Sequence, residues 1–348
     1  METAGYADSD HVSVVSPSVN GSVENPIRGI RVGGSYLVDV VSAASVDIVS
    51  TASKRWKEVR HAGTLDARYK PHDIGVTASG YASVEPDYRS LGAGGSFVYD
   101  FADRMHTFTL GYSFAEDVSG RSGTPFSVFS NVIDKHNISP GLTLTIDRST
   151  VLSLMFDAMF EKGDSSKPYR YVPFFESETA VPAGASVNLV NRVRLPERAL
   201  ERLPTSRDRF AFSGRLLHRW EHVTLRLNER LYADNWGLVA STTDMRLPVD
   251  VGKRWRVFPH GRLHVQQGVS FWKHAYTLES GAFPTYWAGD RELGPLRTYT
   301  LGGGAQVDLG GFIVSGQVDG IYTRFLDALY IAQRWGVLGS LGVEAVFE

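Results

Sequence analysis

The chain has 348 residues, with 38 acidic and 36 basic side chains and a formal net charge of −2. This balance lacks the basic excess of nucleic-acid-binding proteins, and we expect no nucleic-acid partner. The absence of cysteine excludes disulfides, thiolate metal sites and cysteine nucleophiles. No run of residues approaches the roughly 18 apolar residues of a membrane-spanning helix.

Short segments with alternating apolar and polar residues recur along the chain. Successive residues of a β-strand point to opposite faces, so this pattern predicts strands with one apolar and one polar face. In the first half these segments cover residues 15–23, 32–40, 59–70, 74–85, 90–101, 107–114, 138–146 and 152–161. Residues 1–14 interrupt the series, and we expect them to form a short extra strand or a tail inside the protein. They lack the basic region and apolar core of a signal peptide, which favours a mature exported chain with an added start methionine.

The largest insertion covers residues 162–206 and has no such alternation, which is typical of a functional or disordered loop. The segment that follows, 207–234, predicts a hairpin with its turn at Glu221-His222. Its first arm places Phe210, Phe212 and Trp220 on one face and arginines on the other. Further alternating segments cover residues 244–251, 256–271, 299–307, 314–322 and 337–347.

One apolar face for lipid and one polar face for a wet lumen, in segments of about ten residues, are typical of a transmembrane β-barrel. We therefore predict a single all-β domain over residues 1–348: an antiparallel barrel of about 14 to 16 strands in a bacterial outer membrane. Short connections alternate with long ones, which predicts short periplasmic turns and long extracellular loops. Residues 162–206 would be an extracellular or constriction loop. Aromatic residues near strand ends would form interfacial girdles: Tyr69, Phe101, Trp220, Trp255, Trp272 and Phe347.

Five phrases resemble a family of uncharacterised bacterial outer-membrane β-barrels, known as a domain of unknown function. They are DVVSAAS at 39–45, EVRH at 58–61, KPYRYVP at 167–173, RLPER at 194–198 and ERLYADNW at 229–236. The resemblance covers nearly the whole chain and implies export but no activity. It also implies a periplasmic redox partner, because such genes are sometimes found near those of flavin-transfer and thioredoxin-like proteins. The chain departs from the barrel-assembly signal, an aromatic last residue, because Glu348 follows Phe347.

The arginine-rich faces suggest a passive channel, because a barrel of this size leaves an aqueous lumen unless loops fill it. One wall would carry arginines and the other aspartates, which would orient solutes in a transverse field. Alternatively, these groups pair across neighbouring strands and fill the lumen, leaving a scaffold for a periplasmic or lipoprotein partner. The candidate residues are Arg209, Arg215, Arg219, Arg226, Arg230, Arg246, Arg256 and Arg262, facing Asp66, Asp100, Asp147 and Asp157.

Three further hypotheses concern metals, catalysis and partners. Asp8, Asp10, Asp39 and Asp47 offer hard oxygen ligands for calcium at the outer rim, although their spacing matches no known calcium loop. We expect no other cofactor. His218 would face lipid while His260 and His264 face the lumen, and no serine motif accompanies them, so we expect no enzyme. The expected partners are the bilayer, lipopolysaccharide and the barrel-assembly machinery.

Overall fold

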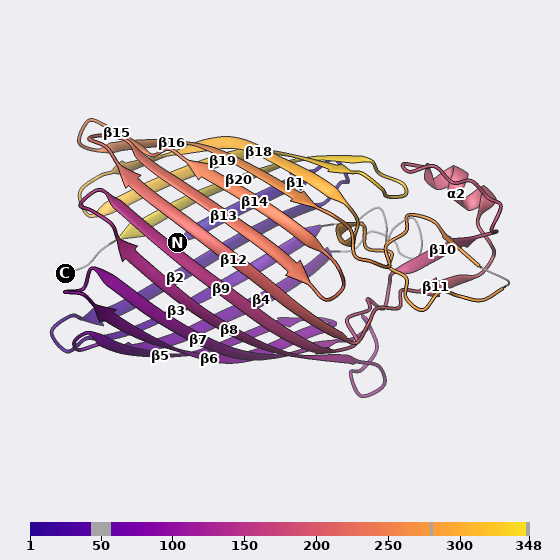
Figure 1. Ribbon diagram of the computed structural model, residues 1–348, viewed down its shortest axis with the longest axis horizontal. Coiled ribbons are helices and arrows are strands. Elements are labelled where there is room, and N and C mark those ends of the chain that lie inside the picture. The colour runs from indigo at the N-terminus through magenta and orange to yellow at the C-terminus, as the bar shows by residue number, and fades with distance from the viewer. Residues whose placement is uncertain (43–56, 279–280, 346–348) are drawn as a thin grey trace.

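A computed structural model describes residues 1–42, 57–278 and 281–345, and it shows a closed antiparallel β-barrel (Figure 1). Its sheet has 17 strand segments that form 16 barrel strands, because β14 and β15 are two pieces of one strand. The first nine strands are β1 (Glu2–Asp8), β2 (Ser13–Asn25), β3 (Ile30–Ser42), β4 (Lys57–Tyr69), β5 (Ile74–Glu85), β6 (Tyr88–Phe101), β7 (His106–Ser119), β8 (Asn131–Thr145) and β9 (Thr150–Gly163).

The second half of the barrel begins after the long insertion. It consists of β12 (Ser206–Arg219), β13 (Thr224–Asp234), β14 (Val239–Arg246), β15 (Val249–Val251), β16 (Trp255–Gln266), β18 (Leu296–Asp308), β19 (Phe312–Phe325) and β20 (Gln333–Ala345). The strand count lies within the predicted range, and the predicted hairpin at 207–234 is formed by β12 and β13.

The N-terminal segment is a strand of the barrel wall. β1 pairs with β2 on one side and with β20 on the other, which closes the barrel. Of the two possibilities raised by residues 1–14, a short extra strand is therefore the one that the structure contains. Among the described residues, closure leaves the sheet without a free edge strand, as a barrel in lipid requires.

Two local features of the second half differ from the sequence prediction. The strand expected over 244–251 is interrupted at Leu247 and Pro248, because proline has no N–H for the ladder. The strand expected over 256–271 ends at Gln266, and the apolar residues Val269 and Phe271 pack into a cluster outside the barrel. The alternation past Gln266 is thus a coincidence of spacing.

The two ends of the barrel have different connections. One end carries seven short turns, which include residues 70–73, 102–105, 146–149, 220–223, 252–254 and 309–311 (Figure 1). The predicted short connections all lie at this end. The long connections lie at the opposite end, which also has three short ones at residues 9–12, 86–87 and 235–238. The predicted asymmetry between the two ends is confirmed, but not every connection at the opposite end is long.

Three of the long connections fold together into a cap, which we define as residues 164–205, 267–278, 281–295 and 326–332. It contains β10 (Tyr171–Phe175), α2 (Val187–Val193), β11 (Arg198–Leu200), β17 (Tyr276–Thr277) and the 3-10 helix η1 (Arg291–Leu293). β10 pairs with β11 and with β17 in a small sheet beyond the barrel rim (Figure 1). Phe174 and Phe175 in β10 are fully buried against other parts of the cap. No helix among the described residues has the length and apolar character needed to span a membrane.

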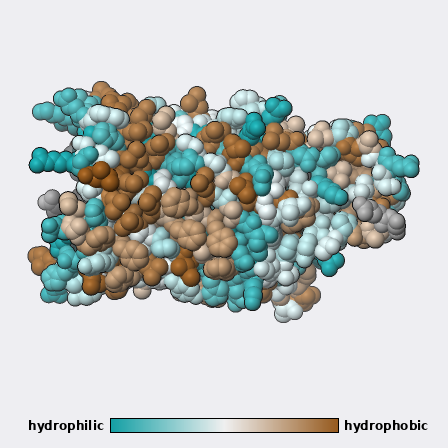
Figure 2. Space-filling model, viewed as in Figure 1, coloured by the Kyte–Doolittle hydropathy of each residue, from teal (hydrophilic) through white to brown (hydrophobic). Residues whose placement is uncertain are grey.

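The outer wall is a band of exposed apolar side chains between two polar ends (Figure 2). Leu301, Leu341 and Leu65 are 77%, 70% and 73% exposed, which is costly in water and favourable in lipid. Tyr69, Trp220 and Trp255 are exposed near the short-turn end, as expected for an interfacial girdle. Trp272 does not belong to it: its indole N–H donates to the Asp327 carbonyl at 2.8 Å within the cap. Phe347 lies outside the described residues.

Candidate functional site: the lumen wall and its vestibule

The predicted arginines all point into the barrel from four neighbouring strands, β12, β13, β14 and β16. The registers pair Ser213 with Arg230, Arg215 with Asn228, Arg226 with Arg246, and Asp244 with Arg262, so these residues share one face. The opposite face of the same strands holds Phe210, Phe212 and Leu231, which are exposed on the outer wall. Strand alternation therefore makes this wall of the lumen basic.

Several of these arginines form ion pairs with carboxylates one or two strands away. Arg209 contacts Glu161 at 2.7 Å, and Arg230 contacts Asp157 at 3.2 Å. At the short-turn end, Arg219 and Arg256 both bind Asp250, at 2.5 and 2.7 Å. Arg246 is 3.9 Å from Asp244 and donates to Gln317. The pairing that the alternative hypothesis required is present along part of the wall.

Three arginines of the wall have no carboxylate partner among the described residues. Arg215 donates to the Asn228 amide oxygen at 2.7 Å, while Arg226 and Arg262 have no side-chain partner within the described part of the chain. All three are exposed although they face inward, and the side chain of Arg230 is 49% exposed. An inward side chain can be exposed only where the described residues leave the lumen open to water.

The predicted acidic residues do not form a separate wall. Asp66 pairs with Arg31 at 2.8 Å, Asp100 pairs with Lys70, and Asp157 lies on β9 directly beside the arginine strands. Asp147 is in a short turn, where the Ser149 N–H donates to its carboxylate at 2.7 Å. This hydrogen bond lowers the pKa of Asp147. The described residues thus place positive and negative charges close together around the lumen.

The inward histidines have different surroundings. His260 is buried between two carboxylates, with Nδ1 2.8 Å from Asp319 and Nε2 3.0 Å from Asp244. His264 Nδ1 forms a hydrogen bond with the Thr242 hydroxyl group at 2.7 Å. Both ring nitrogens of His260 already have partners in the wall, so this side chain links strands of the barrel and stabilises the wall. His218 lies on the outer face beside Trp220, as predicted.

A cavity of about 520 Å³, which we call the vestibule, lies where the lumen meets the cap. Barrel residues Arg60, Lys135 and Arg209 line it on one side, and cap residues Lys167 and Glu201 line it on the other. The sequence did not indicate the acids Glu85, Asp87 and Glu201, because none lies in a motif. Glu58, Glu85 and Asp87 have carboxylate oxygens within 4.8 Å of one another, the one such group found among the described residues.

Four of the five phrases that carry the family resemblance meet around the vestibule. Glu58 and Arg60 come from EVRH, Lys167 to Arg170 from KPYRYVP, and Trp236 from ERLYADNW. Asp39, from the first phrase, accepts a hydrogen bond from Arg60 Nε at 2.7 Å. Residues 43–45 of that phrase lie outside the described residues. The phrases are thus parts of one structural region, although they are far apart in sequence.

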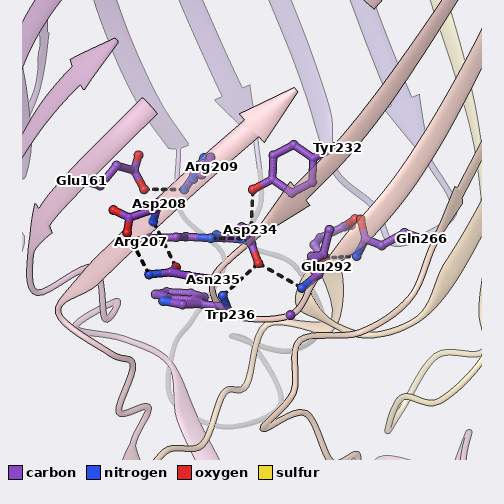
Figure 3. A network of polar contacts seen from close by, with 12 residues as sticks. Glu161, Arg207, Asp208, Arg209, Tyr232, Asp234, Asn235, Trp236, Gln266 and Glu292 are labelled. Atoms are coloured by element: carbon purple, nitrogen blue, oxygen red, sulfur yellow. Dashed lines mark hydrogen bonds and ion pairs between the residues drawn. The ribbon is translucent and has the colours of Figure 1, made fainter. Parts of the chain in front are cut away.

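The turn after β13 holds a compact polar network at the edge of the vestibule (Figure 3). Arg207 donates from Nε and Nη2 to Asp234 at 2.8 and 2.6 Å, and Tyr232 donates to the same carboxylate at 2.9 Å. The guanidinium of Arg207 also lies 4.3 Å from the Trp236 ring centre. This network fixes the rim where the cap leaves the barrel.

Cap contacts close one side of the vestibule. Tyr169 donates to Asp87 at 2.8 Å, and Arg170 contacts Asp290 at 2.7 Å. Burial raises the pKa of Tyr169, and burial also raises the pKa of Glu201, whose side chain is fully enclosed. These contacts attach the insertion to the loops that follow β5 and β16.

The residues proposed for calcium have other partners. Asp8 accepts hydrogen bonds from the backbone of Asp10 and Val12, at 2.9 and 3.0 Å. Asp10 is buried against Arg291, and Asp39 belongs to the pair with Arg60. Asp47 lies outside the described residues. The structure therefore does not assemble Asp8, Asp10 and Asp39 into one set of ligands.

Comparison with known proteins identifies the family. A family profile matches residues 17–341, which is most of the chain. The chain belongs to the family described as "Protein of unknown function (DUF3570)". The resemblance seen in the sequence is therefore confirmed, and the family description assigns no activity. No curated protein matches the DUF3570 chain in sequence.

Solved structures share the fold with this DUF3570 chain. A "Bacterial polysaccharide outer membrane secretin" has a TM-score of 0.51 at 9% identity, with 99% of this chain and 97% of that chain covered. The ferric enterobactin receptor PfeA in complex with BCV-L6 has a TM-score of 0.50 at 9% identity, with 99% of this chain covered. The chain spans 60% of that receptor's length. At such identities the likeness shows only the outer-membrane barrel fold.

Proposed function

We propose that this protein is a passive channel of a bacterial outer membrane that favours anionic solutes, and that it has no catalytic activity. The observation that carries the proposal is the set of inward, exposed arginines without a carboxylate partner: Arg215, Arg226 and Arg262. Their uncompensated charges give the middle of the wall a positive potential where the described residues leave space for water. A ring or wall of arginines is a common selectivity device for anions.

The two ends of the barrel support an orientation. Bacterial outer-membrane barrels have short periplasmic turns and longer extracellular loops. The end with the seven short turns would therefore face the periplasm, and the cap would face outward. The vestibule, with its mixed charges and its volume of about 520 Å³, would then be the outer entrance. This places the insertion at 162–206 beside the entrance, where it narrows the opening.

A planar-bilayer experiment tests the channel. The purified protein should give steady openings, and its reversal potential in a salt gradient should show anion preference. Replacing Arg226 and Arg230 with alanine should shift selectivity toward cations, because it removes two wall charges and leaves Asp157 unpaired. Arg192→Ala is the matched control, because Arg192 lies on α2 in the cap, away from the lumen. An unchanged reversal potential in the double variant would exclude these arginines as selectivity residues.

The second candidate function is a scaffold, and the cross-strand ion pairs favour it. In that case the folded barrel conducts nothing, and a periplasmic or lipoprotein partner copurifies with it. Heat-modifiable gel mobility must first show that the protein without conductance is folded. A folded barrel that shows no conductance would favour the scaffold over the channel.

A further inference from the structure

Two arginines on the outer wall face each other without a counter-ion. Arg297 of β18 and Arg324 of β19 are directly paired in the register, both are exposed, and both lie one residue inside the cap-side strand ends. No carboxylate within the described part of the chain forms an ion pair with either. Like charges directly opposite each other on neighbouring strands are destabilising. An anion between them would remove that repulsion.

The surroundings of this pair place it at a membrane interface. The next outward residues toward the barrel middle are Tyr299 and Tyr322, whose ring centres are 6.3 Å apart. Trp335 of β20 continues the row, 4.4 Å from Tyr322. Beyond this aromatic row lie lipid-facing side chains such as Leu301, which is 77% exposed. Aromatic rows mark the headgroup level of a membrane, so the two guanidinium groups lie where lipid phosphates lie.

An apolar groove of about 730 Å³ begins at Arg297. It runs over the outer faces of β9, β12, β13, β14 and β16 and is lined by Phe210, Leu231, Val265 and Leu326. This is part of the apolar band on the face shown in Figure 2. A groove of this character fits hydrocarbon chains, and the arginine pair at its end fits an anionic headgroup.

We propose that Arg297, Arg324 and this groove form a binding site for a phosphorylated glycolipid of the outer leaflet, lipopolysaccharide. Its phosphate lies between the two guanidinium groups, and its acyl chains lie in the groove. Arginine binds phosphate through parallel N–H···O bonds, so two arginines bind a phosphate group more tightly than neutral side chains would. The choice of this lipid rests on the proposed orientation, in which the cap end faces outward.

Native mass spectrometry of the purified protein in detergent tests the site. The probes are a diphosphorylated, acylated disaccharide and the same lipid without phosphate. The phosphorylated lipid should bind at least about tenfold more tightly, because each charge-assisted contact contributes on the order of one decade in affinity. Arg297→Ala combined with Arg324→Ala should remove this preference. Arg28→Ala combined with Arg254→Ala, two exposed arginines at the short-turn end, should retain it.

Two further arms identify what is bound. Leu326→Asn should weaken both lipids, because it reduces the apolar surface of the groove beside Arg297. Inorganic phosphate should not displace the lipid at millimolar concentration; full displacement would show a site for soluble phosphate and overturn the proposal. Equal binding of the two lipids would also overturn it. Conductance is measured separately on the same preparation, so a silent barrel that binds the lipid refutes only the channel.

Discussion

Asp234 is the residue whose loss should damage the barrel rim most. Its carboxylate is fully enclosed and accepts five hydrogen bonds, three of them from Arg207 and Tyr232. The other two come from the backbone N–H groups of Trp236 and Leu238, at 3.0 and 2.9 Å. These two bonds shape the turn between β13 and β14 (Figure 3). One side chain therefore holds both a buried cation and a turn.

The size of the effect follows from what remains after Asp234→Ala. Arg207 has only 12% of its side chain exposed, so its charge would stay largely buried without a counter-ion. Removing one partner of a buried ion pair costs about 3–5 kcal/mol. Asp234→Asn keeps an oxygen for the two backbone N–H groups, so the turn bonds survive, but it loses the charge and the oxygen that accepts from Arg207 and Tyr232. Its loss of stability should therefore be smaller than that of Asp234→Ala.

Urea unfolding of the refolded barrel, followed by tryptophan fluorescence, measures this difference. Asp208→Asn is the control, because Asp208 is a neighbouring, partly exposed carboxylate that contacts Asn235 at 3.3 Å. Its free energy of unfolding should change by less than about 1 kcal/mol. A loss below about 1 kcal/mol for Asp234→Ala would refute the reasoning, because the buried network would then contribute no more than an exposed contact.

Two further predictions concern the cap and the wall. Burial raises the pKa of Glu201, so the contribution of Glu201 to cap stability should be fully present below the ordinary carboxyl value of 4.5 and be lost as pH rises through the raised pKa. Glu201→Gln should flatten the pH dependence of cap proteolysis while exposed Glu197→Gln does not, and identical profiles would contradict this. Gly302→Ala would put a methyl group 2.3 Å from the Asp319 carboxylate, and we expect the barrel to lose about 1–3 kcal/mol in urea unfolding. Gly261→Ala has open space and should be tolerated; equal loss in both variants would contradict a steric cause.

The barrel was predictable because its signal is local. Alternation fixes which side chain faces lipid, so Arg226, His218 and Trp220 all lie on the predicted faces. Turns and loops follow from the same pattern, because each change of direction interrupts it. Glu229 is a residue that the pattern did not explain: it lies on the outer face, where the hydroxyl groups of Ser241 and Thr243 donate to it.

The cap and the ion pairs were not predictable, because they depend on contacts between distant segments. The Arg209–Glu161 pair requires the register of β12 on β9, and the whole insertion lies between these strands. Trp272 and Phe271 continue an alternating pattern but pack in the cap, and only the folded loops show this. The vestibule likewise combines residues from EVRH and KPYRYVP, whose proximity no spacing in the sequence indicates.

The paired interior and the open lumen are compatible in this barrel. A cross-strand pair such as Arg230 with Asp157 joins side chains that start from neighbouring parts of one curved wall. Such a pair fixes the guanidinium along the wall and need not extend across the lumen, and the Arg230 side chain indeed remains 49% exposed. Pairing then reduces the net charge of part of the wall, while Arg226 and Arg262 keep theirs. Anion selectivity should therefore depend more on the number of unpaired arginines than on the total number of arginines. We expect Arg262→Ala to reduce the anion preference more than Arg219→Ala, because Arg219 is already paired with Asp250, which it shares with Arg256.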